Sequence, residues 1–192
     1  IYIQMNDGNS QNLQITNTQS NNNAASGFHL ENLRGTIKLE NNTLTQNGNW
    51  GLWIDGANNP TTTLTNNNIH DNTNGIYIQE INGITLNNTN NNIHDNGGYA
   101  IQLENADQTT IENLTFNNTI RAYNYAIYAN NCDNLLLNNL NINNNSIQAI
   151  WINGIATNTT INNTNITNST GQAILFPDGS VLTNININNT NI

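Results

Sequence analysis

The sequence predicts an all-β protein folded as a solenoid, in which three short strands make up each turn. A motif of roughly 24 residues recurs about eight times along the 192-residue chain. Within each copy, apolar residues alternate with a period of two, which is typical of strands rather than helices. Repeats of this length that contain strands are characteristic of solenoids. We therefore expect about eight turns in a single domain spanning residues 1–192, with no linker.

The first strand of each turn is expected just after a small residue. Gly or Ala stands there in the internal copies, and a larger side chain would collide with the neighbouring turn at this corner. In one copy, Ile76 and Ile78 should point into the coil and Tyr77 outward. The internal copies span residues 27–30, 51–54, 75–78, 100–103, 126–129, 149–152 and 173–176, and residues 1–4 form a further copy.

Two more apolar anchors in each repeat predict a second and a third strand. The second anchor is expected at Ile15, Leu39, Leu64, Leu86, Leu114, Leu137, Ile161 and Leu182. The third is expected at Leu44, Ile69, Ile93, Ile142, Ile166 and Ile187, with Phe116 and Ile120 both fitting in the fifth repeat. The chain contains 51 Asn, which suits polar corners because Asn tolerates left-handed backbone. Stacked Asn side chains can also bond to one another along the coil.

At this point the chain resembles the right-handed parallel β-helix family, whose fold is that of pectate lyase. The segments at residues 68–78 and 92–97, both built on Asn-Ile-His-Asp-Asn, are the most typical. The resemblance implies a right-handed, single-stranded parallel β-helix with three sides, as does the general preference for right-handed crossovers. It implies no single activity, because the family includes lyases, hydrolases, epimerases, phage tailspikes and surface adhesins.

Composition argues against nucleic-acid binding and against a membrane-spanning helix, and it favours one location. Arg34, Lys38 and Arg121 are the only Lys or Arg residues, at a net charge of −9, so the phosphate-neutralising patch required for nucleic acid is missing. No run of about 20 apolar residues predicts a membrane helix. Cys132 is the single cysteine and is expected to be a packed thiol. The acidic, Lys-poor and Asn-rich composition favours an extracellular or cell-surface location.

The sequence predicts no catalytic residue and no cofactor. A polysaccharide lyase needs a base and carboxylates gathered to hold calcium, whereas the basic residues here are scattered. The Gly-His-Gly, Arg-Ile-Lys and Asp-Pro-His segments of catalytic relatives are absent. We therefore expect a protein that is not an enzyme, with a polysaccharide-active enzyme as the alternative.

The repeated Ile-His-Asp-Asn segment supplies a candidate metal site. His70 and His94 are 24 residues apart, as are Asp71 and Asp95, so each pair should stack on adjacent turns. Imidazoles flanked by carboxylates can bind a divalent metal or perform acid–base chemistry. We favour a third interpretation, a corner where His faces water and Asp bonds to backbone amides.

The outward position of the first strand is unusually rich in aromatic residues. Such a column can stabilise the sheet through cross-strand pairs, pack against another protein, or bind a glycan. These three interpretations remain open. The candidate binding residues of this strip are Tyr2, His29, Trp53, Tyr77, Tyr128 and Trp151, with Gln102 and Leu175 completing the column.

Ten Asn-x-Ser/Thr sequons permit glycosylation of a secreted chain, although an Asn-rich sequence produces about this number by chance. They lie at Asn41, Asn87, Asn113, Asn117, Asn144, Asn158, Asn162, Asn165, Asn168 and Asn188.

No capping segment is evident at either end of the repeat array. We therefore expect partners that continue the coil, either other copies stacked head to tail in a filament or flanking repeats of a longer chain. The sequence thus predicts an extracellular structural repeat protein, a filament subunit or a stalk of an adhesin. A carbohydrate-binding or carbohydrate-active β-helix is the alternative.

Overall fold

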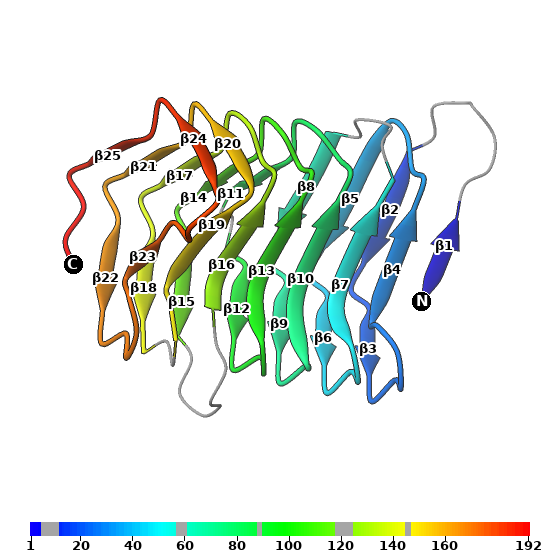
Figure 1. The fold of residues 1–192 in the computed structure, drawn as a ribbon. Helices are drawn as coiled ribbons and strands as arrows, with labels where there is room; N and C mark the ends of the chain where they lie inside the picture. Colours follow the sequence, from blue (N-terminus) through cyan, green and yellow to red (C-terminus); the bar gives the residue numbers. More distant parts are fainter. Residues whose placement is uncertain (5–11, 57–60, 88–89, 118–124, 145–146) are drawn as a thin grey trace.

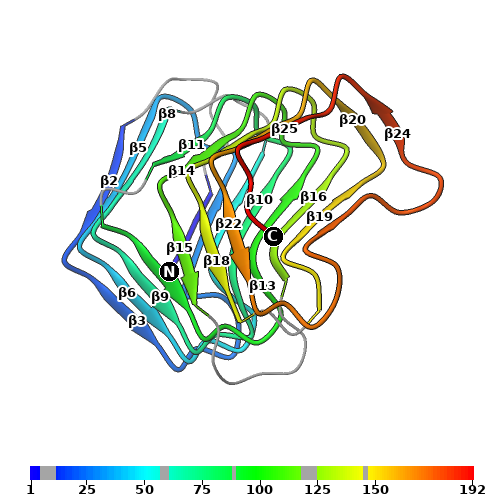
Figure 2. The same cartoon turned by 90° about the vertical axis from the view of Figure 1, so that its left-hand side faces the viewer.

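In the computed structural model, the strands form a three-sided parallel coil (Figure 1). The structure describes residues 1–4, 12–56, 61–87, 90–117, 125–144 and 147–192. Seen nearly along its axis, the coil is closed on all three sides (Figure 2). The sequence prediction of an all-β parallel solenoid is confirmed. Its first side carries eight strands, so about seven turns separate the first strand from the last.

Face I is formed by the first strand of every turn, and successive strands pair in parallel. Its strands are β1 (Tyr2–Gln4), β4 (Phe28–Glu31), β7 (Trp50–Asp55), β10 (Asn74–Gln79), β13 (Tyr99–Glu104), β16 (Tyr125–Asn130), β19 (Ile150–Asn153) and β23 (Ile174–Leu175).

Face II is divided into three short sheets. One contains β2 (Leu13–Thr16), β5 (Thr36–Glu40) and β8 (Thr61–Thr65). The next contains β11 (Thr85–Asn87), β14 (Thr110–Glu112), β17 (Leu136–Asn138), β21 (Thr160–Asn162) and β25 (Asn186–Asn188). The last pairs β20 (Ile155–Thr157) with β24 (Val181–Thr183).

Face III is a single seven-stranded sheet. Its strands are β3 (Gln19–Asn21), β6 (Thr43–Thr45), β9 (Asn68–His70), β12 (Asn92–His94), β15 (Thr115–Asn117), β18 (Asn141–Asn143) and β22 (Asn165–Thr167).

The core is built from inward ladders that repeat once per turn. On face I, Phe28, Leu52 and Ile76 occupy one ladder and are at most 1% exposed. Each such side chain contributes roughly 1.5–3 kcal/mol by leaving water. Cys132 lies in the same core at 1% exposure, which confirms the predicted packed thiol. Burial raises the pKa of this thiol to about 12, so it is held in the unreactive protonated form.

Three anchor predictions need correction. Ile111 of β14, not Leu114, pairs with the second-strand residue Leu86. In the last turn, Ile187 pairs with Ile161 on face II rather than on face III. Leu182 instead pairs with Ala156, because the chain after β19 forms an additional short strand, β20, that shifts the phase of the repeat. In the fifth repeat Phe116 takes the third position, and Ile120 lies outside the described residues.

Asn has two structural roles at the corners. It supplies 17 of the 22 described non-glycine residues with positive φ, which fits its tolerance of left-handed backbone. Other Asn side chains are buried and form amide ladders: Asn47 Nδ2 donates to Asn72 Oδ1 at 2.8 Å, and Asn72 Nδ2 donates to Asn96 Oδ1 at 3.1 Å. The predicted stacking of Asn side chains is therefore confirmed.

Candidate functional site

The outward positions of face I form one column, as the sequence predicts. Strand register aligns these positions across all eight strands. In order they are Tyr2, His29, Trp53, Tyr77, Gln102, Tyr128, Trp151 and Leu175.

A second set of aromatic residues, which the sequence analysis missed, lies beside this column. Trp50, Tyr99 and Tyr125 each directly precede the small corner residue of a face I strand. Each lies three residues before an outward position of the column, so strict alternation of side chains would point it inward. At the corner, however, two consecutive residues are buried, as for Ala100 and Ile101, so the preceding side chain also points outward. The recurring aromatic–small dipeptide is the signal that could have revealed them.

Together the two sets make a continuous chain of ring contacts, here called the aromatic strip. Where Gln102 interrupts the first column, Tyr99 carries the contacts past it, with its ring 6.1 Å from Trp50 and 5.4 Å from Tyr128 between centroids. From strand β1 to β19 the linked rings are Tyr2, His29, Trp53, Tyr77, Trp50, Tyr99, Tyr125, Tyr128 and Trp151.

The rings differ in how much of their surface a ligand could reach. His29 and Trp53 stack at 4.1 Å and 15°, which covers the faces they share. Trp53 and Tyr77 are tilted by 50°, and Tyr128 meets Trp151 at 81°, so these pairs do not cover each other's faces as stacking does. Tyr77 is nevertheless only 9% exposed. Trp50 is only 7% exposed and acts mainly as packing. The strip is therefore half-buried rather than a fully exposed ridge.

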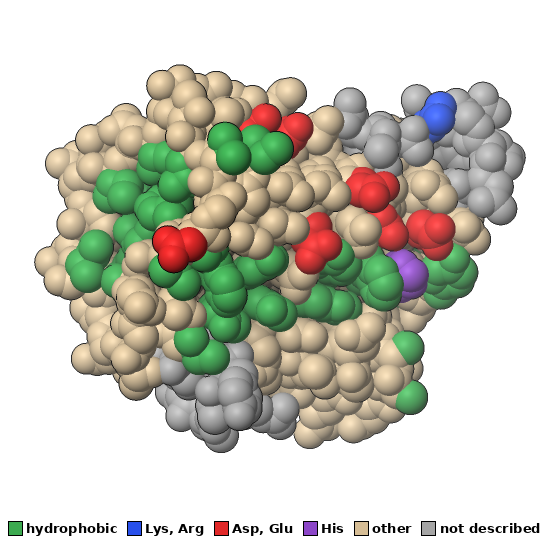
Figure 3. All heavy atoms as spheres, in the orientation of Figure 1, with side chains coloured by type: hydrophobic (Ala, Val, Ile, Leu, Met, Phe, Trp, Pro, Cys, Tyr) green, Lys and Arg blue, Asp and Glu red, His purple; other side chains and the backbone are tan. Residues whose placement is uncertain are grey.

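Carboxylates border the strip. Two residues beyond the aromatic position on each strand, the register aligns Glu31, Asp55, Gln79 and Glu104. Tyr2 donates its hydroxyl to Glu31 at 2.6 Å, and Tyr77 donates to Glu104 at 2.9 Å. In the space-filling view, hydrophobic side chains run as a band along the coil and Asp and Glu side chains lie beside it (Figure 3).

Burial favours the protonated form of Tyr77, Tyr99 and Tyr125. Burial, reinforced by the hydrogen bond to Glu104, raises the pKa of Tyr77 far above its ordinary value. Burial is also the first cause of the raised pKa values of Tyr99 and Tyr125. A phenolate base would need the opposite shift, toward the working pH. These hydroxyls therefore serve as hydrogen-bonding groups at neutral pH.

A hollow of about 480 Å³ lies beside the first rings of the strip. Tyr2, His29 and Trp53 supply aromatic wall, and Asn23 and Asn49 supply amides. The ring nitrogens Trp53 Nε1 and His29 Nε2 are shielded from solvent and have no hydrogen-bond partner among the described residues, and the same holds for Trp151 Nε1. Buried polar atoms without partners are uncommon in folded proteins, but these nitrogens have almost no accessible surface, so a ligand on the strip would meet the ring surfaces rather than these atoms.

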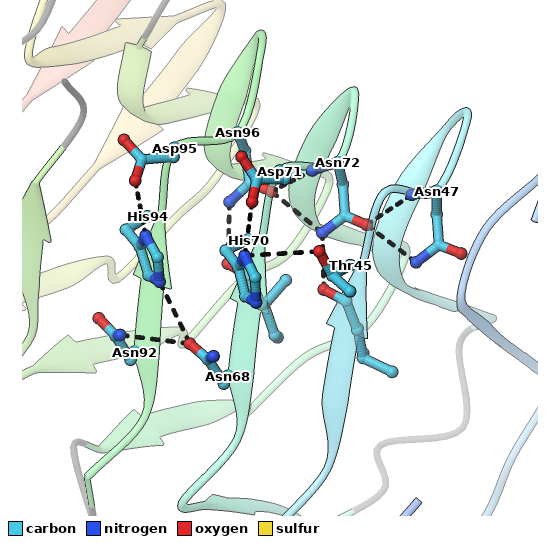
Figure 4. A network of polar contacts seen from close by, with 12 residues as sticks. Thr45, Asn47, Asn68, His70, Asp71, Asn72, Asn92, His94, Asp95 and Asn96 are labelled. Carbon is cyan, nitrogen blue, oxygen red and sulfur yellow. Dashed lines mark hydrogen bonds and ion pairs between the residues drawn. The ribbon is translucent and has the colours of Figure 1, made fainter. Parts of the chain in front are cut away.

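The two histidines end the face III strands β9 and β12, and Asp71 and Asp95 directly follow them (Figure 4). The His70 and His94 rings stack in parallel at 4.9 Å and 4°, and each Nδ1 lies 2.8 Å from the carboxylate of the following Asp71 or Asp95. Parallel rings do not aim their nitrogens at one point. In the described part of the chain, no group of three His, Cys, Asp or Glu residues could hold a metal. The metal interpretation, which the sequence analysis did not favour, therefore gains no support from this geometry.

The sequon residues lie on the outside of the coil wherever the structure describes their side chains. Asn162 and Asn165 are half-buried, and the side chains of Asn87 and Asn117 lie outside the described residues. Several donate their Nδ2 to the turn before, as Asn158 does to Asn134 at 3.0 Å. A sugar attached there would share a nitrogen that already serves an amide ladder. The exposed members are Asn41, Asn113, Asn144, Asn158, Asn168 and Asn188.

Lys and Arg are absent from the described strands of face I. Lys38 lies on face II, where its Nζ pairs with Glu40 at 2.7 Å. Arg34 follows β4 in the chain, and Arg121 lies outside the described residues. Across the described residues, no helix has the length and apolarity needed to cross a membrane.

Comparisons with known proteins agree with this architecture. A family profile described as "Right handed beta helix region" matches residues 1–63 and 50–192. A solved structure, the A-module of mannuronan C-5 epimerase AlgE4 from Azotobacter vinelandii, is similar with a TM-score of 0.66 at 16% sequence identity. The similarity covers 93% of this chain and 54% of that module, so the chain spans about half the module's length. At this identity the likeness concerns the fold alone. A search of curated proteins finds no match.

Proposed function

Since the chain belongs to the right-handed β-helix family, we propose that it is a structural β-helix of the cell exterior that binds polysaccharide along face I and performs no catalysis. The observation that carries this proposal is the continuous aromatic strip from Tyr2 to Trp151, bordered by carboxylates. Contiguous aromatic surface on a protein usually marks an interaction site. Aromatic faces attract the C–H groups of sugar rings, because the faces are electron-rich.

An extended ligand fits the strip better than a compact one. The rings span seven strands, or roughly 30 Å at about 4.8 Å per strand. Accessible ring surface occurs toward both ends of the strip: Tyr2 is 58% exposed and Trp53 partly exposed at one end, and Trp151 is partly exposed at the other. A polymer lying parallel to the coil axis would reach both, whereas a single sugar would reach one. The hollow beside Trp53 provides additional depth at one end.

The absence of catalysis in this proposal rests on the chemistry of the strip. Its buried tyrosines have pKa values shifted away from those of a general base. The similar epimerase module shows that a β-helix can belong to a polysaccharide-active protein, but this is an analogy at the level of fold. The buried Asn ladders support a stiff coil suited to a stalk or filament. Stacking with other copies or flanking repeats remains a prediction.

The test is a glycan array followed by affinity measurements on purified chain. We expect Trp53→Ala and Trp151→Ala each to weaken binding to the selected polysaccharide by at least about tenfold, which corresponds to about 1.4 kcal/mol. Trp53→Phe should retain most of the affinity because it keeps an aromatic face. Circular dichroism would show that each variant is folded.

His94→Ala is the matched control, since it removes an outward ring from face III. It should leave affinity unchanged. Failure of the wild-type chain to bind any glycan, or equal losses in the face I and face III variants, would contradict the proposal. Depolymerisation or epimerisation of a bound polysaccharide would show instead that the chain is an enzyme.

A further inference from the structure

The charges beside the aromatic strip indicate which polysaccharides it can accept, an inference that rests on the proposed function. Glu31 and Asp55 occupy directly opposed positions on neighbouring strands, and Glu104 follows two strands later in the same column. No face I strand contains Lys or Arg, and His29 of β4 is the only titratable base on these strands. A ligand on the strip would therefore meet fixed negative charge that no neighbouring Lys or Arg on these strands offsets.

Two of these carboxylates, Glu31 and Glu104, are held in place by hydrogen bonds. Glu31 accepts hydrogen bonds from Tyr2 at 2.6 Å and from Gln4 at 3.0 Å. Glu104 accepts from Tyr77 at 2.9 Å and from Gln102 at 2.5 Å. Because the donors belong to the strip and its flanking strand positions, the negative charge is fixed within reach of any ligand that covers the rings.

Asp55 shows that this face already concentrates negative charge. Burial raises the pKa of Asp55, and repulsion from Glu80 and Glu31 raises it further, which outweighs the lowering effects of His29 and of the Gly56 amide. A polyuronate, which carries one carboxylate per sugar, would add a second row of like charge along the first. A neutral sugar would instead donate its hydroxyls to the carboxylates, as charge-assisted hydrogen bonds.

We propose that face I selects uncharged, hydroxyl-rich polysaccharides and rejects polyuronates. The aromatic rings contribute affinity for sugar rings of either kind, since a uronate presents the same C–H groups as the neutral sugar. Discrimination arises from the row Glu31, Asp55 and Glu104. Rejection of polyanions by like charge is a recognised route to specificity, because it weakens one ligand without strengthening the other.

The test compares polysaccharides that differ in charge. Mannan and polymannuronate form one pair, and galactan and polygalacturonate form another. The wild-type chain should bind a neutral member at least about tenfold more tightly than its uronate partner at low ionic strength. Neutral binding should change little between about 0.01 M and about 1 M salt, a range over which the Debye length falls from about 30 to about 3 Å.

The triple variant Glu31→Gln, Asp55→Asn and Glu104→Gln should reduce the difference in affinity between the neutral polymer and its uronate partner, mainly by strengthening uronate binding. Gln retains an acceptor oxygen for the hydroxyls of Tyr2 and Tyr77, so the fold is preserved, which thermal unfolding would verify. Glu40→Gln, which removes one charge from face II, is the control and should leave the preference unchanged.

The outcomes separate the two proposals. Equal or tighter binding of a polyuronate by the wild-type chain would overturn the charge selection while leaving polysaccharide binding intact. Tighter, salt-sensitive binding of chitosan than of any neutral polymer would also overturn it, in favour of a cationic ligand. Binding to no member of either pair and to no glycan on the array would overturn the proposed function itself.

Discussion

At the scale of single residues, the buried Asn side chains are as important to this coil as the apolar ones. Asn72 is fully buried. Its Oδ1 accepts from both nitrogens of Asn47, at 3.0 and 2.8 Å, and its Nδ2 donates to the Leu44 carbonyl at 2.9 Å. One side chain thus satisfies polar groups on two turns. An Asn-rich composition, which in another pattern would indicate disorder, here supplies buried hydrogen bonds.

Asn72→Ala should therefore be strongly destabilising. It removes the acceptor of the Asn47 backbone amide and the donor to the Leu44 carbonyl, and each unsatisfied buried group costs about 1–3 kcal/mol. Asn47 Nδ2 keeps the Ser20 carbonyl, and Asn96 keeps the Asn72 backbone amide and the Ile69 carbonyl. Allowing for partial relaxation, we expect a loss of about 3 kcal/mol in the free energy of unfolding, measured by urea denaturation. Asn141→Ala removes an exposed amide contact with Asn165 and should cost about 0.5 kcal/mol or less. Equal effects of the two variants would refute the structural role assigned to the buried ladder.

At the scale of elements, the corner before each face I strand limits side-chain size. Gly75 does not have a positive φ, so its requirement is for space. A Cβ atom on Gly75 would clash with the backbone oxygen of Ala100 and would lie 3.2 Å from Asn96 Nδ2. The same corner turns two consecutive side chains inward, and this is what brings Trp50, Tyr99 and Tyr125 onto the outer face.

Gly75→Ala should accordingly destabilise the chain by about 1–3 kcal/mol, the usual cost of overpacking. The direction of the stability change shows whether the corner has room for a methyl group. Where the native conformation permits it, Gly→Ala stabilises a protein by about 0.4–1 kcal/mol through the unfolded state. Ala126→Gly at the equivalent corner two turns on should cost no more than about 1 kcal/mol. Chemical denaturation of both variants measures the difference, and a stabilised Gly75→Ala chain would show that the corner has room to spare.

Period-two alternation and the 24-residue repeat were sufficient to predict the three faces and the outward column, because both follow directly from strand geometry. They failed where the geometry departs from a regular strand. The corner bend hid Trp50, Tyr99 and Tyr125, and the additional strand β20 displaced Leu182 and Ile187 from their expected positions. Ring tilts and the partial burial of the strip depend on packing between turns, which spacing along the chain does not encode.

At the scale of the whole molecule, negative charge is unevenly placed. The chain has twelve Asp and Glu against three Lys and Arg, and part of this excess lies along face I. Asp55 lies between Glu31 and Gln79 in the register, with Glu80 one residue beyond Gln79. Burial first, then repulsion from Glu80 and Glu31, raises the pKa of Asp55 above its ordinary value. The folded state therefore holds the Asp55 proton more tightly than the unfolded state does.

The pH dependence of folding follows from this difference. Below the unfolded pKa of 3.8 the carboxyl is protonated in both states and costs nothing. As pH rises through the raised folded value, ionisation penalises the folded state, and stability is lost. Asp55→Asn should thus increase the melting temperature at pH about 7, by an amount equivalent to about 0.5 kcal/mol or less because solvent screens this partly exposed group. The gain should vanish below the unfolded pKa.

Thermal unfolding of the wild-type chain and Asp55→Asn at several pH values tests this expectation, with Glu40→Gln as the control on face II. Glu40 pairs with Lys38, so neutralising it should not stabilise the chain at neutral pH. A gain from Asp55→Asn that persists in acid would mean that it arises from packing rather than charge. A loss at neutral pH would mean that the carboxylate stabilises the fold, which would contradict the unfavourable effect of burial and like charge on Asp55.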